Sequence, residues 1–526
     1  MAWLERLANR RLGGAVLFVL ALAVYAVRAI GWPLVSGRDL DEYLYAYVQF
    51  LDWHPLLPWS MLFRTPATPV VDGLALDVAH GFFAEPLLAV LFAGSVVAWS
   101  AAARWFSTRG ALLTALALLI YPAWGLMFHE LSSEPLFAAS FSLWAWLVVR
   151  AAMRPSPLAF AWVGLGVALM AFVRPGNALL LAFVAFVLLV PGAWRQRAVW
   201  AGAFVAAAIV PMAAWAILNG VRFGDYALAR GGNAVIPFYR AYISDKIVSP
   251  DNGPASRKLA AAVRDHLVTK DPYRAYGVTV GDVFRSGSFR IHEDFYLLSD
   301  QVFGWDSNYS VLRKAGIEAV KEHPGKYTSG VLHTIWHQLS KSYFRTPPSK
   351  SPPPPQTEKA DGRTLPRPTE GQPIPAGQTV WISRPDNSIR EVWTSGTQHH
   401  FEFEHPRDKP HFDAIVHDES RLAGNLPDRG GSSWLALKLN QLSRWFPRLI
   451  LWIAAGVFAL VLRRPRRASV LVALSLAALF VITFNALGLF ADPRFALPVA
   501  PAFVLFCSAA LFGRKEPGAR SREDAS

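Results

Sequence analysis

The chain has 526 residues, of which 53% are hydrophobic and only 17% are charged, and its formal net charge is +14. This composition excludes an ordinary soluble globular protein, because the apolar residues also gather in long blocks. The single cysteine, Cys507, excludes any intrachain disulfide. The chain is therefore predicted to be a polytopic membrane protein.

Apolar blocks long enough to cross the hydrocarbon core, which takes about 20 residues, recur along the chain. Seven begin near Gly13, Phe82, Gly110, Glu134, Pro157, Asn177 and Ala198, and three more near Trp445, Ala468 and Phe495. We expect ten transmembrane helices in a mainly α protein. The first 32 residues resemble a secretory signal but lack a small-x-small cleavage site, so we interpret them as a retained anchor.

Basic residues predict the orientation. With a cytoplasmic N-terminus, seventeen arginines and lysines next to the spans lie inside, against five arginines in the short outer loops and span ends. The positive-inside rule then places both termini in the cytoplasm, as expected for an inner-membrane protein. Much of the net positive charge is thus a topology signal, and we predict no nucleic-acid partner.

Composition divides the chain into parts. Residues 1–219 are predicted as a membrane core of seven spans with a long first outer loop at 33–81, residues 220–444 as an extracytoplasmic region, residues 445–513 as the last spans, and residues 514–526 as a cytoplasmic tail. The outer region, inserted between spans seven and eight, is expected to mix helices and strands. It thus has the length of a domain with its own core.

The outer region is not uniform. Apolar residues recur at helical spacing from Ser310 to Tyr343, around a break at Pro324. Residues 347–377 are rich in proline and predict an extended linker. Residues 378–418 contain short alternating runs and predict a small β-rich part.

Unusual polar residues at the span ends all fall on the predicted outer side. They are Asp39, Asp41, Glu42, His129, Glu130, Glu134, Arg174, Asp492 and Arg494. Solvated charges have no reason to prefer one surface, and ionisable groups at membrane depth are functional candidates. This shared side predicts a site at the outer membrane surface.

Asp41 and Glu42 are candidates for a general base. An aspartate is a weak base near its ordinary pKa of about 3.9, so Glu42, Asp39 and partial desolvation would have to raise the pKa of Asp41. Asp39 is the rival for this role. The alternative is an ordinary solvated carboxylate, with Arg38 and Glu42 forming an i, i+4 pair on a helix.

The other candidates also have two interpretations. His129 and Glu130 could position an acceptor or bind a divalent cation, although two ligands are too few to define a metal site. Glu134 either serves the site or favours the helix N-terminus that it opens. Arg174 and Arg494 could hold phosphate oxygens. Their alternative is snorkelling at the interface, which is how we interpret Arg28.

Several short motifs together resemble the GT-C class of integral-membrane glycosyltransferases that use polyprenyl-phosphate sugars. This class includes the protein O-mannosyltransferases and the lipid A aminoarabinose transferases. The matching segments are Asp41-Glu42 with Tyr45-Ala46, Arg64-Thr65-Pro66, Ser132 to Phe137, Val173-Arg174-Pro175, Asn219 to Asn233, Ala319 to Tyr327, and Arg494-Phe495 with Pro498. The insertion from about Pro347 to Arg444 has no counterpart in the resemblance.

The resemblance implies an inverting glycosyltransferase. It would move a sugar from a polyprenyl-phosphate carrier to a hydroxyl of a cell-envelope glycan, lipid or protein at the extracytoplasmic face. Asp41 would be the base, and Arg174 and Arg494 would offset the charge of the leaving phosphate. The residues implied in positioning the acceptor or substrate are Tyr45, Arg64, His129, Glu130 and Glu134. No cofactor is required, and a divalent cation is left open.

The alternative is a transporter or flippase for a lipid-linked or polar substrate, in which charged residues line a path. Transporters of this kind usually show paired repeats and broken helices near the midplane. The sequence shows neither, and its charges lie at span ends. The glycosyltransferase interpretation is therefore favoured.

Overall fold

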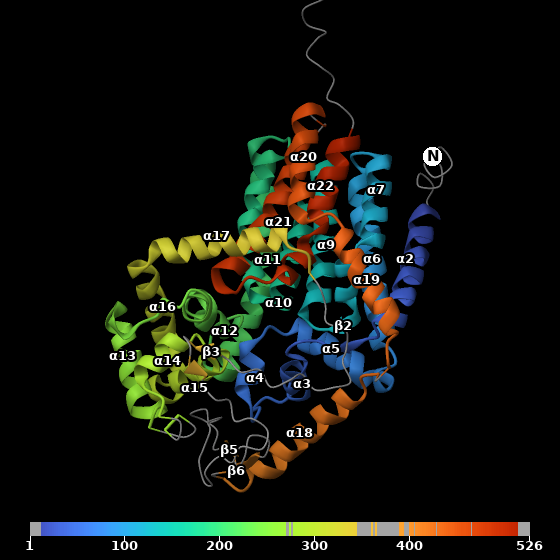
Figure 1. Cartoon of the computed structure of the whole chain (residues 1–526). Helices are drawn as coiled ribbons and strands as arrows, with labels where there is room; N and C mark the ends of the chain where they lie inside the picture. Colours follow the sequence, from blue (N-terminus) through green and yellow to red (C-terminus); the bar gives the residue numbers. More distant parts are fainter. Residues whose placement is uncertain are drawn as a thin grey trace, which may run out of the picture.

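The computed structural model describes residues 12–269, 273–274, 277–343, 359–360, 363–364, 389–393, 399–403, 405–427, 429–463, 465 and 467–513. Long, nearly parallel helices form a bundle, and a smaller helical region lies at one end of it (Figure 1). The predicted proline-rich linker falls almost entirely outside the described residues.

Each predicted apolar block forms helix. The helices of the bundle are α2 (Leu12–Gly31), α6 (Ala84–Arg104), α7 (Thr108–Ile120), α8 (Pro122–Leu126), η2 (Met127–His129), α9 (Ser133–Met153), α10 (Pro157–Val173), η3 (Pro175–Leu189), α11 (Trp194–Phe223), α20 (Leu449–Arg463), α21 (Ala468–Gly488), η8 (Pro493–Val499) and α22 (Pro501–Phe512). Fully buried aromatic side chains, among them Phe92, Trp99, Phe137, Phe141 and Trp144, fill the centre of this bundle. The mainly α membrane fold is confirmed.

The number of spans depends on how broken helices are counted. In the described part of the chain, six helices are long and apolar enough to cross a membrane, and two bent pairs raise the number to eight. The other two expected spans correspond to the shorter helices α10 and η3. Ten spans therefore stays a prediction.

Two pairs of consecutive apolar helices in the described residues are bent, contrary to the expectation of unbroken helices. The chain bends by 64° between α7 and α8 and by 53° between η8 and α22. A proline opens the second helix of each pair, Pro122 in α8 and Pro501 in α22. Proline lacks the N–H that would continue the helix, so the preceding carbonyls lose their partners.

Arg28 supplies hydrogen bonds at the first of these breaks. It lies in α2, only 4% exposed, and its Nη2 donates to the carbonyl oxygens of Leu119 at 2.6 Å and Tyr121 at 3.3 Å. Its guanidinium lies so close to Gly125 that a Cβ at that position would overlap it. The snorkelling interpretation of Arg28 was wrong, because the broken helix offers carbonyl acceptors inside the bundle.

The predicted outer loop folds into short elements beside the end of the bundle. They are β1 (Val35–Ser36), α3 (Leu40–Val48), α4 (Pro58–Phe63), α5 (Ala67–Asp77) and η1 (Val78–Gly81). β1 pairs in parallel with β2 (Glu130–Leu131), so the loop is joined to the segment between η2 and α9. The polar residues after α2 and before α9 are thereby brought together.

The helical region at the end of the bundle has its own core. Its elements are α12 (Gly231–Ala234), η4 (Val235–Ser244), η5 (Pro250–Asn252), α13 (Pro254–Ala262), η6 (Val263–Leu267), α14 (Val280–Ser286), α15 (Phe289–Phe303), η7 (Trp305–Ser307), α16 (Ser310–Glu322) and α17 (Pro324–Ser340). The predicted helical pattern with its break at Pro324 is confirmed by α16 and α17. Arg240 of η4 anchors the region, since its Nη1 donates to the carbonyls of Ala486 at 2.8 Å and Leu489 at 3.0 Å at the end of α21.

The described part of the insertion contains both strands and helices. Two short hairpins are described, β3 (Lys359–Ala360) with β4 (Arg363–Thr364), and β5 (Ile389–Trp393) with β6 (His399–Phe403). The end of the predicted β-rich part is instead helical, within α18 (Asp408–Gly424), and α19 (Ser433–Trp445) follows. α18 lies along the outer loop, where Arg421 pairs with Asp77 of α5 at 3.3 Å.

We expect Arg28→Met to lower the stability of the protein. The substitution leaves the carbonyls at the α7–α8 break without a donor inside the bundle, a loss of about 1.5 to 3 kcal/mol for hydrogen bonds from a charged group. Thermal melting of the purified protein in detergent measures the loss. Val27→Met is the matched control, because Val27 is 57% exposed on the same helix; equal melting temperatures for both variants would contradict the capping role of Arg28.

Candidate active site

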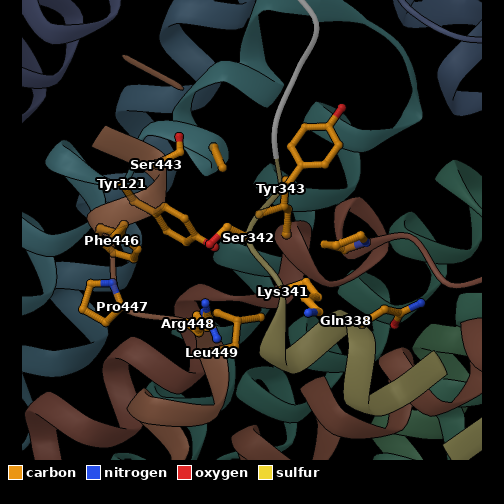
Figure 2. A pocket seen from close by; sticks show the side chains of 13 residues that line it. Tyr121, Gln338, Lys341, Ser342, Tyr343, Ser443, Phe446, Pro447, Arg448 and Leu449 are labelled. Carbon is orange, nitrogen blue, oxygen red and sulfur yellow. The ribbon is translucent and has the colours of Figure 1, made fainter. Parts of the chain in front are cut away.

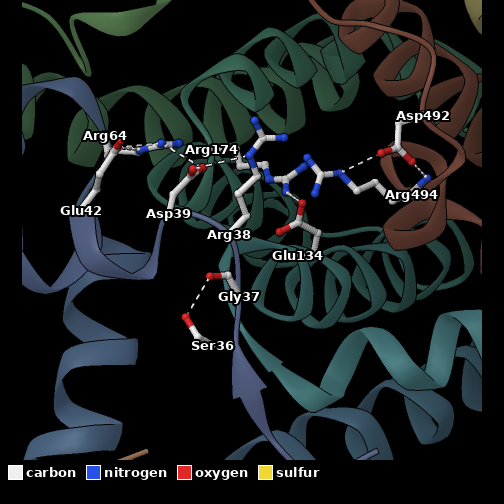
Figure 3. Close-up of polar contacts among 10 residues, drawn as sticks. All are labelled: Ser36, Gly37, Arg38, Asp39, Glu42, Arg64, Glu134, Arg174, Asp492 and Arg494. Carbon is white, nitrogen blue, oxygen red and sulfur yellow. Dashed lines mark hydrogen bonds and ion pairs between the residues drawn. The ribbon is translucent and has the colours of Figure 1, made fainter. Parts of the chain in front are cut away.

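A cavity of about 950 Å³ lies where the bundle, the outer loop and the helical region meet. Its size is within the range of about 300 to 1,000 Å³ that is usual for ligand pockets. The charged residues in its lining are Arg38, Asp39, Glu42, Arg64, Glu134, Arg174 and Arg494. Figure 3 shows Glu42, Arg64 and Asp39 at one end of a row that continues to Glu134, Arg174 and Arg494.

The short parallel pairing of β1 and β2 positions the start of the loop. The Gly37 N–H donates to the carbonyl of Leu131 at 3.0 Å, and a Cβ at Gly37 would overlap that oxygen. Two residues later the chain turns sharply, because Asp39 has a φ of 64° in the left-handed region as α3 begins. Non-glycine residues in this region are uncommon and concentrate at functional sites.

Arg64 joins two acidic residues of this loop, Asp39 and Glu42. It follows α4, and its Nη2 lies 2.9 Å from Asp39 Oδ2 and 2.8 Å from Glu42 Oε2. Burial raises the pKa of Glu42, although Arg64 opposes the shift. Burial alone would lower the pKa of Arg64, but Tyr43, Glu42 and Asp39 together raise it, so the guanidinium stays charged. The loop therefore presents carboxylates to the cavity without a large local excess of negative charge.

Arg174 is held by the first turn of α9. Its Nη2 lies 2.7 Å from Glu134 Oε1, and its Nε donates to Ser133 Oγ at 2.9 Å. A carboxylate also suits the N-terminus of α9, where the helix dipole is positive, so the two interpretations of Glu134 are compatible. The side chains of Arg174 and Glu134 are only 21% and 11% exposed, which excludes simple snorkelling of Arg174 into water.

Arg494 reaches the same cavity from the start of η8. Its backbone N–H donates to Asp492 Oδ1 at 2.9 Å, and its Nε lies 3.4 Å from Asp492 Oδ2. Asp492 thus caps the short helix and balances the arginine. Two guanidinium groups from distant parts of the sequence, Arg174 and Arg494, therefore face one cavity.

Asp41 and Tyr45 lie outside this lining. Asp41 is exposed, on the turn of α3 that follows Asp39. Tyr45 is one helical turn further, and burial, with the charges of Glu419 and Asp41, raises its pKa to about 12. Asp41 and Tyr45 thus lie on the side of α3 toward Glu419 of α18, whereas Asp39, Glu42 and Arg64 line the cavity.

His129 and Glu130 are also not among the lining residues. His129 is fully buried, and its ring stacks on Tyr25 of α2 with centroids 4.1 Å apart. Glu130 lies in β2, where its backbone pairs with Val35, and its Oε1 accepts a hydrogen bond from Ser132 at 3.2 Å. Among the described residues, no group of three or more His, Cys, Asp or Glu side chains is placed to hold a metal ion.

Sequence reasoning missed the uncharged part of the lining. Tyr43 of α3 lies beside Arg64, with Cζ of the arginine 5.2 Å from the ring centroid. Tyr239, His292 and Tyr296 come from η4 and α15 and face the cavity together. No motif marks these residues, since only the docking of the helical region onto the bundle brings them to the site.

A second pocket is much smaller. It lies between the end of α17 and the start of α20, near Tyr121, Lys341, Phe446 and Arg448 (Figure 2). Its volume of about 10 Å³ corresponds to a single water molecule. The large cavity is therefore the better candidate for a substrate site.

Comparison with known proteins finds a family and solved structures to which this chain is similar. Residues 81–215, about a quarter of the chain, match the family described as dolichyl-phosphate-mannose-protein mannosyltransferase. Solved structures with similarity include ArnT from Cupriavidus metallidurans bound to undecaprenyl phosphate, with 14% identity over 95% of this chain and 77% of that chain and a TM-score of 0.34. The apo state of ArnT from the same organism has 15% identity over 95% of this chain and 76% of that chain, with a TM-score of 0.31.

The family match confirms the resemblance to this group of glycosyltransferases over α6 to α11. This part of the chain contains Glu134 and Arg174. It does not reach the carboxylates of the outer loop or Arg494. Comparison with the curated proteins gives no match.

Helix α5 carries a buried carboxylic acid, Asp72. Asp72 is 1% exposed, and its Oδ2 has no hydrogen-bond partner. Burial, together with the nearby charges of Glu134 and Glu130, raises the pKa of Asp72 well above its usual range. Desolvation disfavours the charged carboxylate, so the folded protein holds the proton more tightly than the unfolded chain.

We expect Asp72→Asn to stabilise the protein increasingly as pH rises. A pKa that is higher in the folded state means that the stability contributed by Asp72 is full below its unfolded pKa of about 3.9 and is lost as pH rises toward the folded value. The neutral amide has no such dependence. Melting temperatures of both proteins between pH 5 and pH 8 test this, and a difference that stays constant or shrinks with rising pH would contradict a raised pKa.

Proposed function

We propose that the protein transfers a sugar from a polyprenyl-phosphate carrier to a hydroxyl of a cell-envelope acceptor. The observation that carries the proposal is the cavity, where carboxylates of the outer loop and two arginines, Arg174 and Arg494, face the same space. A base and a group that binds a phosphate leaving group are the two requirements of this reaction. The cavity lies at the end of the spans, where a lipid-borne phosphate can enter from the bilayer.

The proposed step is a single displacement with inversion. A loop carboxylate takes the proton of the acceptor hydroxyl. At the same time, the oxygen of that hydroxyl forms a bond to the anomeric carbon. The bond from that carbon to the phosphate oxygen breaks, and the electron pair leaves with the polyprenyl phosphate. Arg174 and Arg494 offset the negative charge that develops on the phosphate, and Glu134 holds Arg174 in place at 2.7 Å.

Asp39 takes the role of base in this proposal. It lines the cavity, whereas Asp41, the residue preferred from the sequence, is exposed outside it. Glu42 also lines the cavity, but one of its oxygens, Oε2, accepts two hydrogen bonds from Arg64, at 2.8 and 3.2 Å. Glu42 therefore positions Arg64, which in turn orients Asp39.

The family match and the predicted topology also support this proposed function. The family that matches residues 81–215 is named for a polyprenyl-type phosphate sugar, which agrees with the proposed donor class. The positive-inside pattern supports an inner membrane protein with the cavity on the extracytoplasmic face. A transporter is less well supported, because the charged residues gather in one cavity at the ends of the spans.

We expect Asp39→Asn to reduce transfer by about 10²- to 10⁴-fold, the usual contribution of a general base. Asp41→Asn is the matched control, two residues away on the same loop, and should retain activity within a few-fold. The assay follows transfer of radiolabelled sugar from a polyprenyl-phosphate donor to added cell-envelope material by the purified protein in nanodiscs. An equal loss in both variants, or a loss only in Asp41→Asn, would move the base away from Asp39.

We expect Arg174→Gln and Arg494→Gln to weaken donor binding. Each variant removes a charge-assisted contact to phosphate, which is worth about tenfold or more in affinity. Arg264→Gln is the control, because Arg264 is exposed on the helical region. The measurement is the KM for the donor together with kcat; unchanged kinetic constants in both cavity variants would remove these arginines from the phosphate site.

A further inference from the structure

Helix α19, the last element of the insertion, runs across the ends of two spans at the cavity end of the bundle (Figure 1). At its start, the Ser432 N–H donates to the carbonyl of Ile30 at 2.8 Å, at the end of α2. At its end, the ring of Phe446 stacks on Tyr121, which follows α7, with centroids 3.9 Å apart. Arg28, about one turn before the end of α2, donates to the Tyr121 carbonyl. The two ends of α19 therefore differ in depth along the bundle by only about one helical turn.

The two faces of α19 have different surroundings. On the inner face, Ala436 is 1% exposed and packs with Trp32 and Leu126. The outer face presents four large apolar side chains that are 48 to 85% exposed: Trp434, Leu437, Leu442 and Trp445. Their spacing of 3, 8 and 11 residues from the first places them on one side of the helix. An apolar face of this kind marks contact with a membrane or another molecule.

The charges around this face are positive. The sequence has no aspartate or glutamate from Arg429 to Ala491, whereas Lys438 and Arg448 are both exposed. Within the part of the chain that the structure describes, neither of these two cations forms an ion pair. A helix with exposed tryptophans and adjacent basic residues is typical of the interface of an anionic membrane. Because α19 lies at the ends of spans, the bilayer reaches its outer face directly, which favours lipid over a second protein.

The small pocket beside α19 offers a place for a lipid head group. Lys341, after α17, and Arg448, before α20, both line it, and its 13 lining residues include no acid (Figure 2). Its volume of about 10 Å³ fits one oxygen atom and not a whole phosphate. A phosphodiester at the mouth of the pocket can place one oxygen inside, while the two cations balance its charge.

We propose that α19, together with Lys341 and Arg448, is a docking surface for an anionic phospholipid. The head-group phosphate lies at the two cations, Trp434 and Trp445 lie at head-group level, and the acyl chains follow the exposed apolar side of α20, where Leu451 is 55% exposed. The small pocket shares no lining residue with the large cavity. The proposal therefore does not depend on the proposed function.

Native mass spectrometry of the full chain in detergent tests the head-group site. The probes are phosphatidylglycerol and phosphatidylcholine with the same acyl chains. We expect phosphatidylglycerol to bind about fivefold more tightly or better, since one basic residue at a membrane surface contributes roughly fivefold. The double variant Lys341→Gln/Arg448→Gln should lose about tenfold or more of this affinity and bind phosphatidylcholine as before. Equal affinities for the two lipids, or full phosphatidylglycerol affinity in the double variant, would overturn the proposal.

The double variant Arg264→Gln/Lys314→Gln is the matched control. It also removes one arginine and one lysine, both exposed on the helical region, and should bind phosphatidylglycerol like the unmodified protein. Melting temperatures verify that both double variants are folded. A loss as large in the control would reduce the effect to net charge and overturn the site. Undecaprenyl phosphate that binds at Lys341 and Arg448 more tightly than phosphatidylglycerol would assign the surface to that lipid and overturn the phospholipid.

Tryptophan quenching tests the apolar face independently of the cations. The variant Trp434→Phe/Trp445→Phe removes two of the 20 tryptophans, so its difference from the unmodified protein isolates the fluorescence of α19. In nanodiscs of phosphatidylglycerol, we expect this difference to be quenched strongly by bromine near the head group and less by bromine near the acyl ends. No quenching by either lipid, or stronger quenching by the deep bromine, would contradict a helix that lies in the interface.

Discussion

The arrangement of the cavity depends on pairing carboxylates with arginines at the edge of the membrane. An isolated charge in a poorly solvated site is costly, so such charges persist only with partners. Here Arg64 forms ion pairs with Asp39 and Glu42, and Arg174 forms one with Glu134, with nitrogen–oxygen distances of 2.7 to 2.9 Å. The pairs hold the acidic and basic side chains in fixed positions, which is the preorganisation that charge separation in glycosyl transfer requires.

Much of the fold and part of the site could be predicted from local sequence. Apolar blocks of span length predict helices because the bilayer forces the backbone to satisfy its own hydrogen bonds. The common side of the polar span ends predicted that Glu134, Arg174 and Arg494 would meet, and all three line one cavity. The break between α16 and α17 at Pro324 could be predicted because proline interrupts a helix.

The remaining features depend on contacts between distant segments. A motif does not say which way a helix faces, so the sequence does not show that Asp39 lines the cavity while Asp41 lies exposed outside it. The left-handed φ of 64° at Asp39 turns the chain at this point. The carbonyls that accept hydrogen bonds from Arg28 lie 91 and 93 residues further along the sequence. Only the packed bundle therefore shows the role of this arginine. The sequence does not show that Tyr239, His292 and Tyr296 line the cavity, for the same reason. At α18, alternating residues suggested strands, but packing against the outer loop selects a helix.

The central claim is that the arginines of this cavity receive the phosphate of a polyprenyl carrier while the loop carboxylates face its sugar end. The most direct measurement is a cryo-EM structure of the full chain in nanodiscs with undecaprenyl phosphate. The account predicts phosphate density within contact of both Arg174 and Arg494, with the isoprenoid chain leaving toward the bilayer. Phosphate density outside this cavity, away from both arginines, would contradict it.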